Sequence, residues 1–245
     1  MDISENKTRR FIEAGADIVI RRLPSLGSLM IIGKANGATH ERIGVVEKVE
    51  PAGACLAATG DHHNSRMDPS LVARIVLDTS SVMQGQVYPR LDFQDEDGGT
   101  VFAFVGFGGL EPFEAGLADL SQSQPTEAVP VPRPQRPDVA ETDPGAVPLK
   151  AALQSATPVT IAFESRGFSQ SWAGTIKRVS PGMGFINIMT PDFHLHLLGG
   201  TMSAWREEDV ASGTVLTALD HDGNPTGLVL SSEIAGAFSD TSMPA

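Results

Sequence analysis

Short runs in which apolar and polar residues alternate make up most of the chain. Their apolar positions are rich in β-branched and aromatic residues, and glycine, proline or aspartate bounds most runs. This pattern is typical of short antiparallel strands joined by tight turns. We predict strands at 43–50, 54–58, 71–78, 86–92 and 101–105 in the first half, and at 174–180, 185–189, 202–206, 215–219 and 227–230 in the second. Helical periodicity is confined to about 8–23, 110–120 and 149–153. The pattern therefore predicts a mainly antiparallel β protein with a few helices, in the α+β class.

The two halves of the chain repeat each other. Matching positions stand at a constant offset of 130 residues (174 − 44), namely Gly37 and Gly167, Gly44 and Gly174, Val49 and Val179, and Pro51 and Pro181. Further on the offset is 125 residues (220 − 95), and it aligns the Asp-Gly turns at 95–98 and 220–223. A fixed offset over many positions is the signature of a duplicated structural unit.

Composition changes abruptly between the two copies. Residues 121–148 are rich in proline, alanine, threonine, glutamine and acids, and such a stretch buries too little apolar surface to offset its ordering entropy. We therefore predict a first repeat at 1–120, a proline-rich linker at 121–148 and a second repeat at 149–245. The two sheet domains are expected to pack as an internal pseudo-dimer.

Charge and hydropathy exclude several classes of protein. The chain has 18 Lys and Arg against 30 Asp and Glu, a formal charge of −12, which argues against binding to nucleic acid or anionic lipid. The most apolar stretch, 11–32, contains Glu13, Asp17 and Arg21, so we expect no membrane insertion. No secretory signal is visible, which favours a cytoplasmic location. The single cysteine, Cys55, excludes a disulfide within the chain and is predicted to lie in the core.

Several segments resemble the haem-utilisation proteins of the HemS and ChuX kind. Residues 170–179, 184–189 and 191–197, followed by Trp205, are similar to the hairpin, the strand and the Trp-bearing strand of the second repeat of HemS-type proteins. In the first half, 23–27 and 39–44 resemble the opening segment of that family, and 80–85 resembles the single-repeat ChuX-like members. The resemblance implies stacked antiparallel sheets with helices, and a cleft that holds haem against a sheet.

The same resemblance implies a function. It suggests a cytosolic haem-binding protein for haem uptake and utilisation, acting as a carrier or buffer, with haem degradation as a further option. Its implied partners are haem and a haem-uptake transporter, and its implied assembly is a monomer or a homodimer. Whether it is an enzyme stays open, because opening the haem ring needs an electron donor and the sequence has no recognisable donor-binding motif.

Four residues are candidates for contact with haem. His194 and His196 alternate along one predicted strand, so both side chains should point to the same face of the sheet. At the repeat offset Arg66 corresponds to His196, and it looks like the haem-contacting arginine of HemS-type proteins. We predict His196 as an iron ligand or its hydrogen-bonding partner, and Arg66 as a contact to a propionate or on the ligand side of the iron. Tyr88, the only tyrosine, is the remaining candidate.

Ordinary structural roles compete with each of these predictions. A strand histidine is often half-buried with one backbone partner, Arg66 would serve as a solvated residue at a sheet edge, and Tyr88 as a packed aromatic. His62 and His63 are predicted as exposed turn residues, and His40 and His221 as loop residues without a chemical role.

The sequence also departs from the family pattern. Several HemS-like members carry a haem-ligating histidine in a helical segment between the repeats, whereas 121–148 contains no histidine. Acidic residues at 207–209 stand where the family has a basic run. A second hypothesis follows, in which the chain is a duplicated β scaffold or small-ligand module that has lost the iron site.

Overall fold

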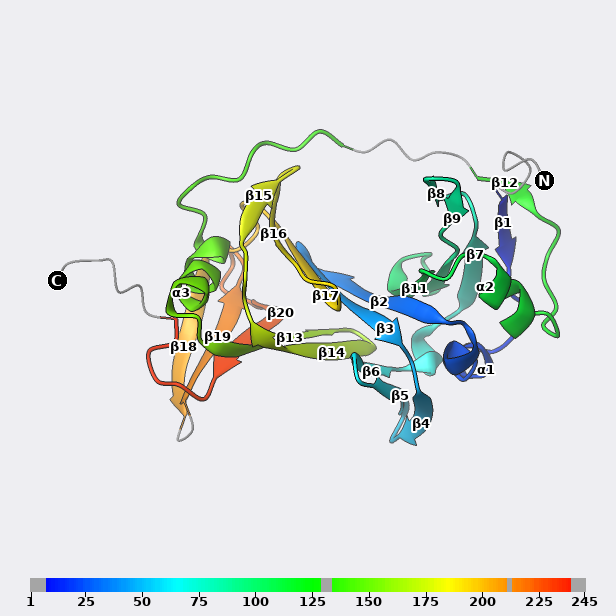
Figure 1. Cartoon of the computed structure of the whole chain (residues 1–245), viewed down its shortest axis with the longest axis horizontal. Helices are drawn as coiled ribbons and strands as arrows, with labels where there is room; N and C mark the ends of the chain where they lie inside the picture. The colour runs from blue at the N-terminus through cyan, green and yellow to red at the C-terminus, as the bar shows by residue number, and fades with distance from the viewer. Residues whose placement is uncertain (1–7, 129–133, 211–212, 239–245) are drawn as a thin grey trace. The chain divides into compact units, whose positions relative to one another are not determined.

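The protein is mainly antiparallel β, as predicted. The computed structural model describes residues 8–128, 134–210 and 213–238, and within them it contains three short helices, α1 (Ala16–Ile20), α2 (Glu111–Gly116) and α3 (Val147–Ser155) (Figure 1). In these residues no helix is long and apolar enough to cross a membrane. The strands of the first half are β1 (Thr8–Phe11), β2 (Ser28–Ala35), β3 (Ala38–Val45), β4 (Lys48–Ala52), β5 (Cys55–Gly60), β6 (His63–Met67), β7 (Arg74–Asp78), β8 (Val82–Met83), β9 (Gln86–Val87), β10 (Arg90–Gln94), β11 (Thr100–Gly106) and β12 (Thr126–Glu127). Those of the second half are β13 (Pro158–Ser165), β14 (Phe168–Thr175), β15 (Ser180–Gly182), β16 (Phe185–Met189), β17 (Phe193–Leu198), β18 (Ala204–Val210), β19 (Gly213–Leu219) and β20 (Pro225–Ser232).

The predicted duplication is visible element by element. Strands β2 to β7 of the first half recur as β13 to β18 at the offset of 130 residues, and β10 and β11 recur as β19 and β20 at the offset of 125 residues. Helix α1 corresponds in the same way to the start of α3. The sequence repeat therefore reflects one structural unit used twice.

Residue contacts divide the chain into two compact units. Unit 1 comprises Met1–Gly33, Glu41–Arg133 and Arg166–Ser169, and unit 2 comprises Lys34–His40, Pro134–Ser165 and Gln170–Ala245. Each unit therefore contains most of one repeat and the tip of one hairpin from the other repeat. The predicted domain boundaries at 120 and 148 stay a prediction, and residues 129–133 of the predicted linker lie outside the described residues.

Unit 1 is organised around a sheet with the strand order β12-β1-β7-β10-β11-β2. Phe93 on β10 packs against Phe102 and Phe104 on β11, with ring centroids 4.7 and 4.8 Å apart, and all three rings are fully buried. A second antiparallel group, β4-β5-β6, is extended by the tip of the β13–β14 hairpin, where Phe168 pairs with Met67. Cys55, at the first residue of β5, is half-buried and free, so the prediction that it lies in the core was wrong.

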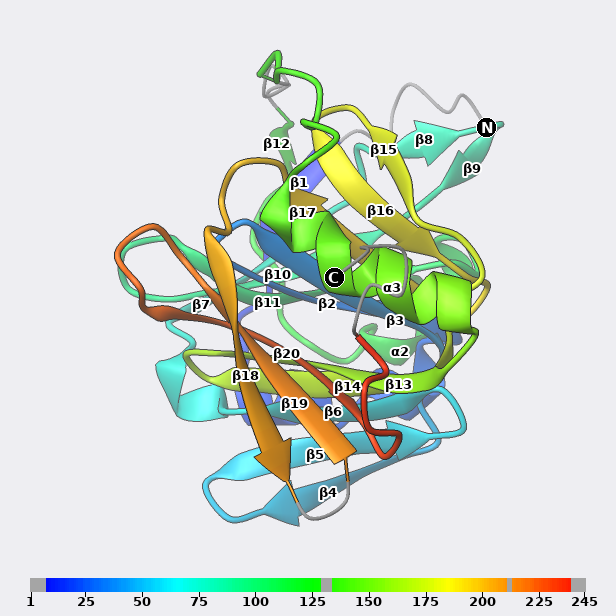
Figure 2. The same cartoon turned by 90° about the vertical axis from the view of Figure 1, so that its left-hand side faces the viewer.

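Unit 2 repeats this arrangement with the strand order β18-β19-β20-β13-β14 and the antiparallel group β15-β16-β17. Its core contains a flat stack of Trp172 on Phe193, with centroids 4.7 Å apart and planes within 9°. Helix α3 lies beside the sheet that contains β13 and β18 (Figures 1 and 2), and it buries Leu149 and Ala152. The end of the predicted linker is ordered in this unit, because Asp143 accepts hydrogen bonds from the backbone N–H groups of Gly145 and Gly200.

Tertiary pairing overrides the local pattern at several predicted elements. The helix predicted at 8–23 was wrong over its first part, because 8–11 is strand β1, which pairs with β7, and only Ala16–Ile20 is helical. The strand predicted at 86–92 is interrupted at Pro89, which has no N–H to donate to a ladder. The helices predicted at 110–120 and 149–153 are confirmed, the first in shorter form as α2 and the second in longer form as α3.

A buried hydrogen-bonded pair joins the two repeats within unit 2. His40 and Gln170 stand at equivalent repeat positions (170 − 40 = 130), and both are buried, at 0% and 4% exposure. Gln170 Nε2 lies 2.9 Å from His40 Nδ1 and 2.7 Å from the His40 carbonyl oxygen, and His40 Nε2 lies 3.1 Å from the Ile161 carbonyl oxygen. Because Gln170 Nε2 is a donor, His40 Nδ1 accepts and Nε2–H donates. The prediction of His40 as a loop residue was therefore wrong.

The cost of breaking this pair is testable with a double-mutant cycle. His40→Leu and Gln170→Leu each leave a buried polar group without its partner, so each should lower the free energy of unfolding by about 1–3 kcal/mol. The double variant removes both groups, so its loss should fall short of the summed single losses by about 1 kcal/mol or more. Urea unfolding gives the free energy of unfolding of the native chain, the two single variants and the double variant. Strictly additive losses would contradict the coupling. The control combines His40→Leu with Gln86→Leu in unit 1, and the losses of these two changes should add.

Candidate functional site

The hairpin of β16 and β17 presents a polar outer face in unit 2. Buried and half-buried residues alternate along β17, with Phe193, Leu195 and Leu197 buried and His194 and His196 half-buried. The register sets Asn187 opposite His196, Met189 opposite His194 and Phe185 opposite Leu198. The predicted placement of both histidines on one face of a strand is therefore confirmed, and their ring centroids lie 5.9 Å apart.

The side chain of Asn187 determines which nitrogen of His196 carries the proton. Asn187 Nδ2 lies 3.1–3.3 Å from the carbonyl oxygens of Ser180, Gly182 and Phe185, which only a donor can satisfy. Its Oδ1 is then the atom 2.6 Å from His196 Nδ1, so Nδ1–H must donate to it. The neutral ring therefore carries its lone pair on Nε2. Histidines that bind a metal typically have their other ring nitrogen fixed in this way.

Apolar and cationic groups surround His196. The rings of Phe185 and His196 are edge-on to each other, with centroids 6.3 Å apart. The guanidinium of Arg136 lies over the Phe185 ring, 4.8 Å from its centroid. Met189, beside His194 in the register, is 60% exposed. The outer face thus combines a nitrogen donor, an exposed thioether, an aromatic ring and a cation within one hairpin and its neighbouring segment.

Two of these residues were missed in the sequence. Asn187 is identified only through its register opposite His196, a cross-strand relationship that requires the connection at 190–192 between β16 and β17 to be placed correctly. Arg136 belongs to the proline-rich segment predicted as a linker, and no pattern in the sequence connects it to Phe185.

The other two candidate residues lie in unit 1. Arg66 on β6 is exposed, and its Nη2 donates to the Ala52 carbonyl oxygen at 3.0 Å. Tyr88 is half-buried, and its ring packs edge-on against Phe107 at 5.7 Å. The structure therefore brings His194 and His196 together and assigns Arg66 and Tyr88 to the other unit.

His62 and His63 have different environments. His62 is an exposed turn residue, as predicted, whereas His63 is the first residue of β6 and only 3% exposed. Its Nε2 lies 3.1 Å from the Gly44 carbonyl oxygen, and burial lowers the pKa of His63 to about 4. The prediction of an exposed His63 was wrong because the inward register of β6 begins at this residue and places its ring in the core of unit 1.

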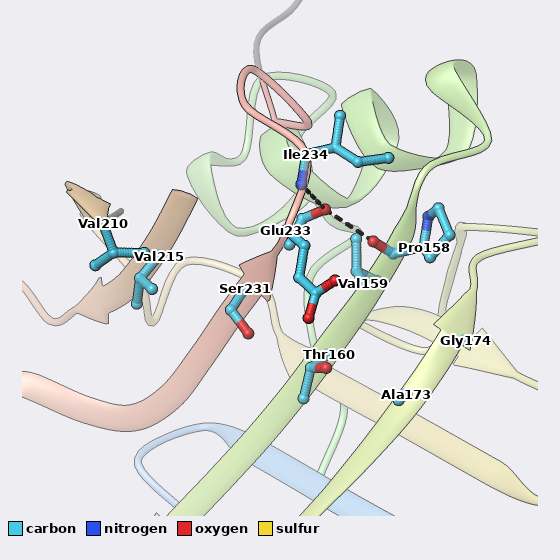
Figure 3. Close-up of a pocket in the computed structure, with 11 residues that line it drawn as sticks. Pro158, Val159, Thr160, Ala173, Gly174, Val210, Val215, Ser231, Glu233 and Ile234 are labelled. Carbon is cyan, nitrogen blue, oxygen red and sulfur yellow. Dashed lines mark hydrogen bonds between the residues drawn. The ribbon is translucent and has the colours of Figure 1, made fainter. Parts of the chain in front are cut away.

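A separate cavity of about 460 Å³ lies in unit 2 (Figure 3). It is lined by small and branched side chains, including Thr160, Ala173 and Val215, and by one carboxylate, Glu233. Ser232 hydroxyl closes one wall by bonding to the Pro158 carbonyl oxygen and the Ile234 N–H. Among the residues that the structure describes, the lining contains no histidine or arginine, so these residues offer no nitrogen ligand and no cation to an anionic metal complex.

No protein-family model matches the chain, and no curated protein matches its sequence. Solved structures do match its fold. The Escherichia coli O157:H7 heme degrading enzyme ChuS superposes with a TM-score of 0.72 at 18% identity, over 98% of this chain and 84% of ChuS. Apo-PhuS, a heme-binding protein from Pseudomonas aeruginosa, superposes with a TM-score of 0.71 at 14% identity, over 95% of this chain and 85% of PhuS. The fold expected from the sequence resemblance is therefore confirmed.

The depressed pKa of His63 predicts a loss of stability in mild acid. An unfolded histidine titrates near 6.5, so as the pH falls from about 6.5 to about 4 the unfolded chain takes up a proton that the folded chain does not. Stability contributed by the neutral ring is fully present above pH 6.5 and falls by up to about 2–3 kcal/mol across this window. Urea unfolding of the native chain and His63→Gln at several pH values measures the difference. Identical pH profiles for the two chains would contradict the assignment.

The tautomer of His196 is predicted directly by its contact with Asn187. Long-range ¹H–¹⁵N correlation spectra at about pH 8, where histidine rings are neutral, should show the proton on Nδ1. Asn187→Ala should restore the Nε2–H tautomer that is usual for a solvated histidine. His221, whose Nε2 lies 2.9 Å from the Gly200 carbonyl oxygen, is the control and should be protonated on Nε2. An Nε2–H tautomer for His196 in the native chain would contradict the predicted geometry.

Proposed function

We propose that the chain binds haem on the outer face of the β16–β17 hairpin, with His196 Nε2 as the iron ligand. One observation carries the proposal: the hydrogen bond from His196 Nδ1 to Asn187 Oδ1 leaves the lone pair of the neutral ring on Nε2. Bound haem supplies an iron centre whose reactivity depends on its axial ligand and on the polarity around it. His194, on the same face, is the second nitrogen donor of the proposed site.

The neighbouring residues fit the remaining requirements of haem. The macrocycle needs apolar contacts, which Phe185, Leu198 and the exposed Met189 provide on the same face. Its two propionates need cationic or hydrogen-bonding partners, and the guanidinium of Arg136, stacked on Phe185, is suited to bind a carboxylate through two parallel hydrogen bonds. Arg66 remains a candidate propionate contact on the sequence resemblance alone.

The shared fold supports a role in haem utilisation. ChuS and PhuS are described as a heme degrading enzyme and a heme-binding protein, and this chain has their fold over nearly its full length. We therefore extend the proposal to a cytoplasmic carrier or buffer that receives haem from an uptake transporter. A monomer or a homodimer is consistent with the duplicated architecture. Degradation of haem is the enzymatic variant of the same proposal.

The second candidate is a duplicated β scaffold that binds a different small ligand. It rests on the linker, which contains no histidine, and on the acidic residues at 207–209. The two candidates differ in one measurable property, saturable binding of hemin at His196.

A visible absorption titration of the metal-free chain with hemin tests the proposal. The native chain should show a saturable Soret change at about one hemin per chain. His196→Ala should alter the position of the Soret band and weaken binding, and Asn187→Ala should weaken it by about 10–100-fold, the usual effect of removing the partner that orients a metal-binding histidine. Arg136→Ala and Arg66→Ala should weaken binding through loss of a propionate contact.

His221→Ala is the matched control, because His221 is an exposed histidine of unit 2 outside the proposed face. It should bind like the native chain. If His194→Ala weakens hemin binding and His196→Ala does not, His194 is the iron ligand in place of His196. If the native chain shows no saturable Soret change, the scaffold hypothesis is favoured. The spectrum followed over time with a reductant and oxygen separates a carrier from a degrading enzyme, since only the latter loses the Soret band in proportion to turnover.

A further inference from the structure

A second pocket, in unit 1, is lined by three arginines in a chain of strongly negative charge, and two of them, Arg9 and Arg74, point to the face of the sheet that carries Phe11. It has a volume of about 260 Å³ and is lined at one edge of the sheet by residues from β1, β7, β10 and β12. These residues are Arg9, Arg10, Phe11, Arg74, Val76, Gln94 and Thr126. No acidic side chain belongs to this lining, whereas the chain as a whole has 30 acidic residues against 18 basic ones.

The three guanidinium groups differ in how they are neutralised. Arg9 Nε forms an ion pair with Asp78 Oδ2 at 3.0 Å, but this buried nitrogen has no hydrogen bond of good geometry among the described residues. The guanidinium of Arg9 is therefore only partly neutralised. Arg10 pairs with Leu77, so its side chain points to the opposite face from Phe11 and Arg74, where its Nη1 lies 3.5 Å from Gln122 Oε1.

Arg74 is held by an aromatic ring. Its guanidinium lies over Phe11, 5.6 Å from the ring centroid, and it forms no ion pair with any residue that the structure describes. The register explains the contact, because Phe11 pairs with Val76, two residues along β7 from Arg74 on the same face. The acidic turn at 95–98 lies nearby, but the carboxylate of Asp95 is engaged by the Gly99 N–H at 2.7 Å.

We propose that this pocket binds a small organic anion, in which a phosphate or carboxylate is attached to a single ring or a short apolar group. Arg9 and Arg74, which the register places on the same face of the sheet as Phe11 and Val76, supply charged donors whose planar geometry matches either oxyanion. Phe11, 44% exposed, and Val76 supply apolar contact beside them. The volume limits the ligand to about the size of one aromatic ring with its acid group, since larger ligands occupy pockets of roughly 300–1,000 Å³.

This site is separate from the one proposed for haem, because its lining residues all belong to unit 1 and the β16–β17 hairpin belongs to unit 2. The chain would then bind a second small molecule, independently of iron. The two proposals are therefore independent, and either can fail alone.

Titration of the isotopically labelled full-length chain with phenyl phosphate and with benzoate tests the proposal by ¹H–¹⁵N spectra. Saturable shifts are expected at the amides of 9–11 and 74–76 and at the Nε–H signals of Arg9 and Arg74. The stronger of the two probes identifies the acid group. Inorganic phosphate should bind more weakly than phenyl phosphate, and benzyl alcohol, which is neutral, should not bind.

Variants locate the site. Arg74→Gln and Arg9→Gln should each weaken binding by about tenfold or more, the effect of losing one charge-assisted hydrogen bond, and Phe11→Leu should reduce the preference for phenyl phosphate over inorganic phosphate. Arg206→Gln is the control, because Arg206 is an exposed arginine of unit 2 with its own carboxylate partner, Glu208, at 3.1 Å. Equal binding by Arg74→Gln and the control, or shifts that do not saturate, would overturn the proposal. Retained spectral dispersion in each variant excludes unfolding as the cause of lost binding.

Discussion

The buried contact between Gln170 and His40 is the interaction on which the core of unit 2 depends. Both side chains are shielded from solvent. The side-chain amide of Gln170 hydrogen-bonds to the ring and the carbonyl oxygen of His40, which would otherwise be buried without partners. His40 also packs its ring against Phe193 at 4.8 Å, and Phe193 in turn stacks on Trp172. Phe193 is the first residue of β17, so the contact that orders this aromatic group also fixes the inward register of the strand. Since side chains alternate, the inward position of Phe193 commits His194 and His196 to the outer face.

Duplication explains how that outer face became specialised. At the offset of 130 residues, the positions of His194 and His196 are occupied in the first copy by Asn64 and Arg66, and that of Asn187 by Ala57. The backbone of the hairpin is thus present twice, but only the second copy has a histidine pair together with a residue that fixes a tautomer. β6 and β17 differ at all five aligned positions, the three buried ones as well as the two solvent-facing ones. The two copies therefore share the backbone of the hairpin while both faces of the strand have diverged.

Alternation in the sequence was sufficient to predict strands such as β5, β11, β16 and β19, because a half-buried strand imposes a period of two on its side chains. It did not identify β2, β6 or β13, and the strand predicted at 174–180 was wrong over 176–179. It failed where tertiary contacts decide the outcome. Residues 8–11 form a strand because β7 offers an edge to pair with, although the sequence around them has helical periodicity. His40 and His63 looked like loop residues, but both are buried in strands. β3 starts at Ala38, before the predicted strand at 43–50, and β6 has no counterpart among the predicted strands. The hairpin of β2 and β3 carries an Asn36-Gly37 turn with positive φ at both residues, and the Asn-Gly pair is a sequence signal for such hairpins. The contact of Arg136 with Phe185 has no local signal at all.

The distribution of charge connects the two proposed sites. A chain with a formal charge of −12 repels small anions at long range, and that repulsion is screened beyond about 8–10 Å at physiological salt. Affinity for an anion must therefore come from cations that lie within a few ångströms of it and that are not paired with a carboxylate of the chain. Arg136 stacked on Phe185 and Arg74 stacked on Phe11 share this property, since in both cases an aromatic ring, rather than a carboxylate, holds the guanidinium in place. A cation–π contact orients the charge at a cost of about 0.5–1 kcal/mol when an incoming ligand displaces it, and it leaves the donor edges of the guanidinium available. The aromatic partner thus orients the arginine for an anion without neutralising it, as an acidic partner would.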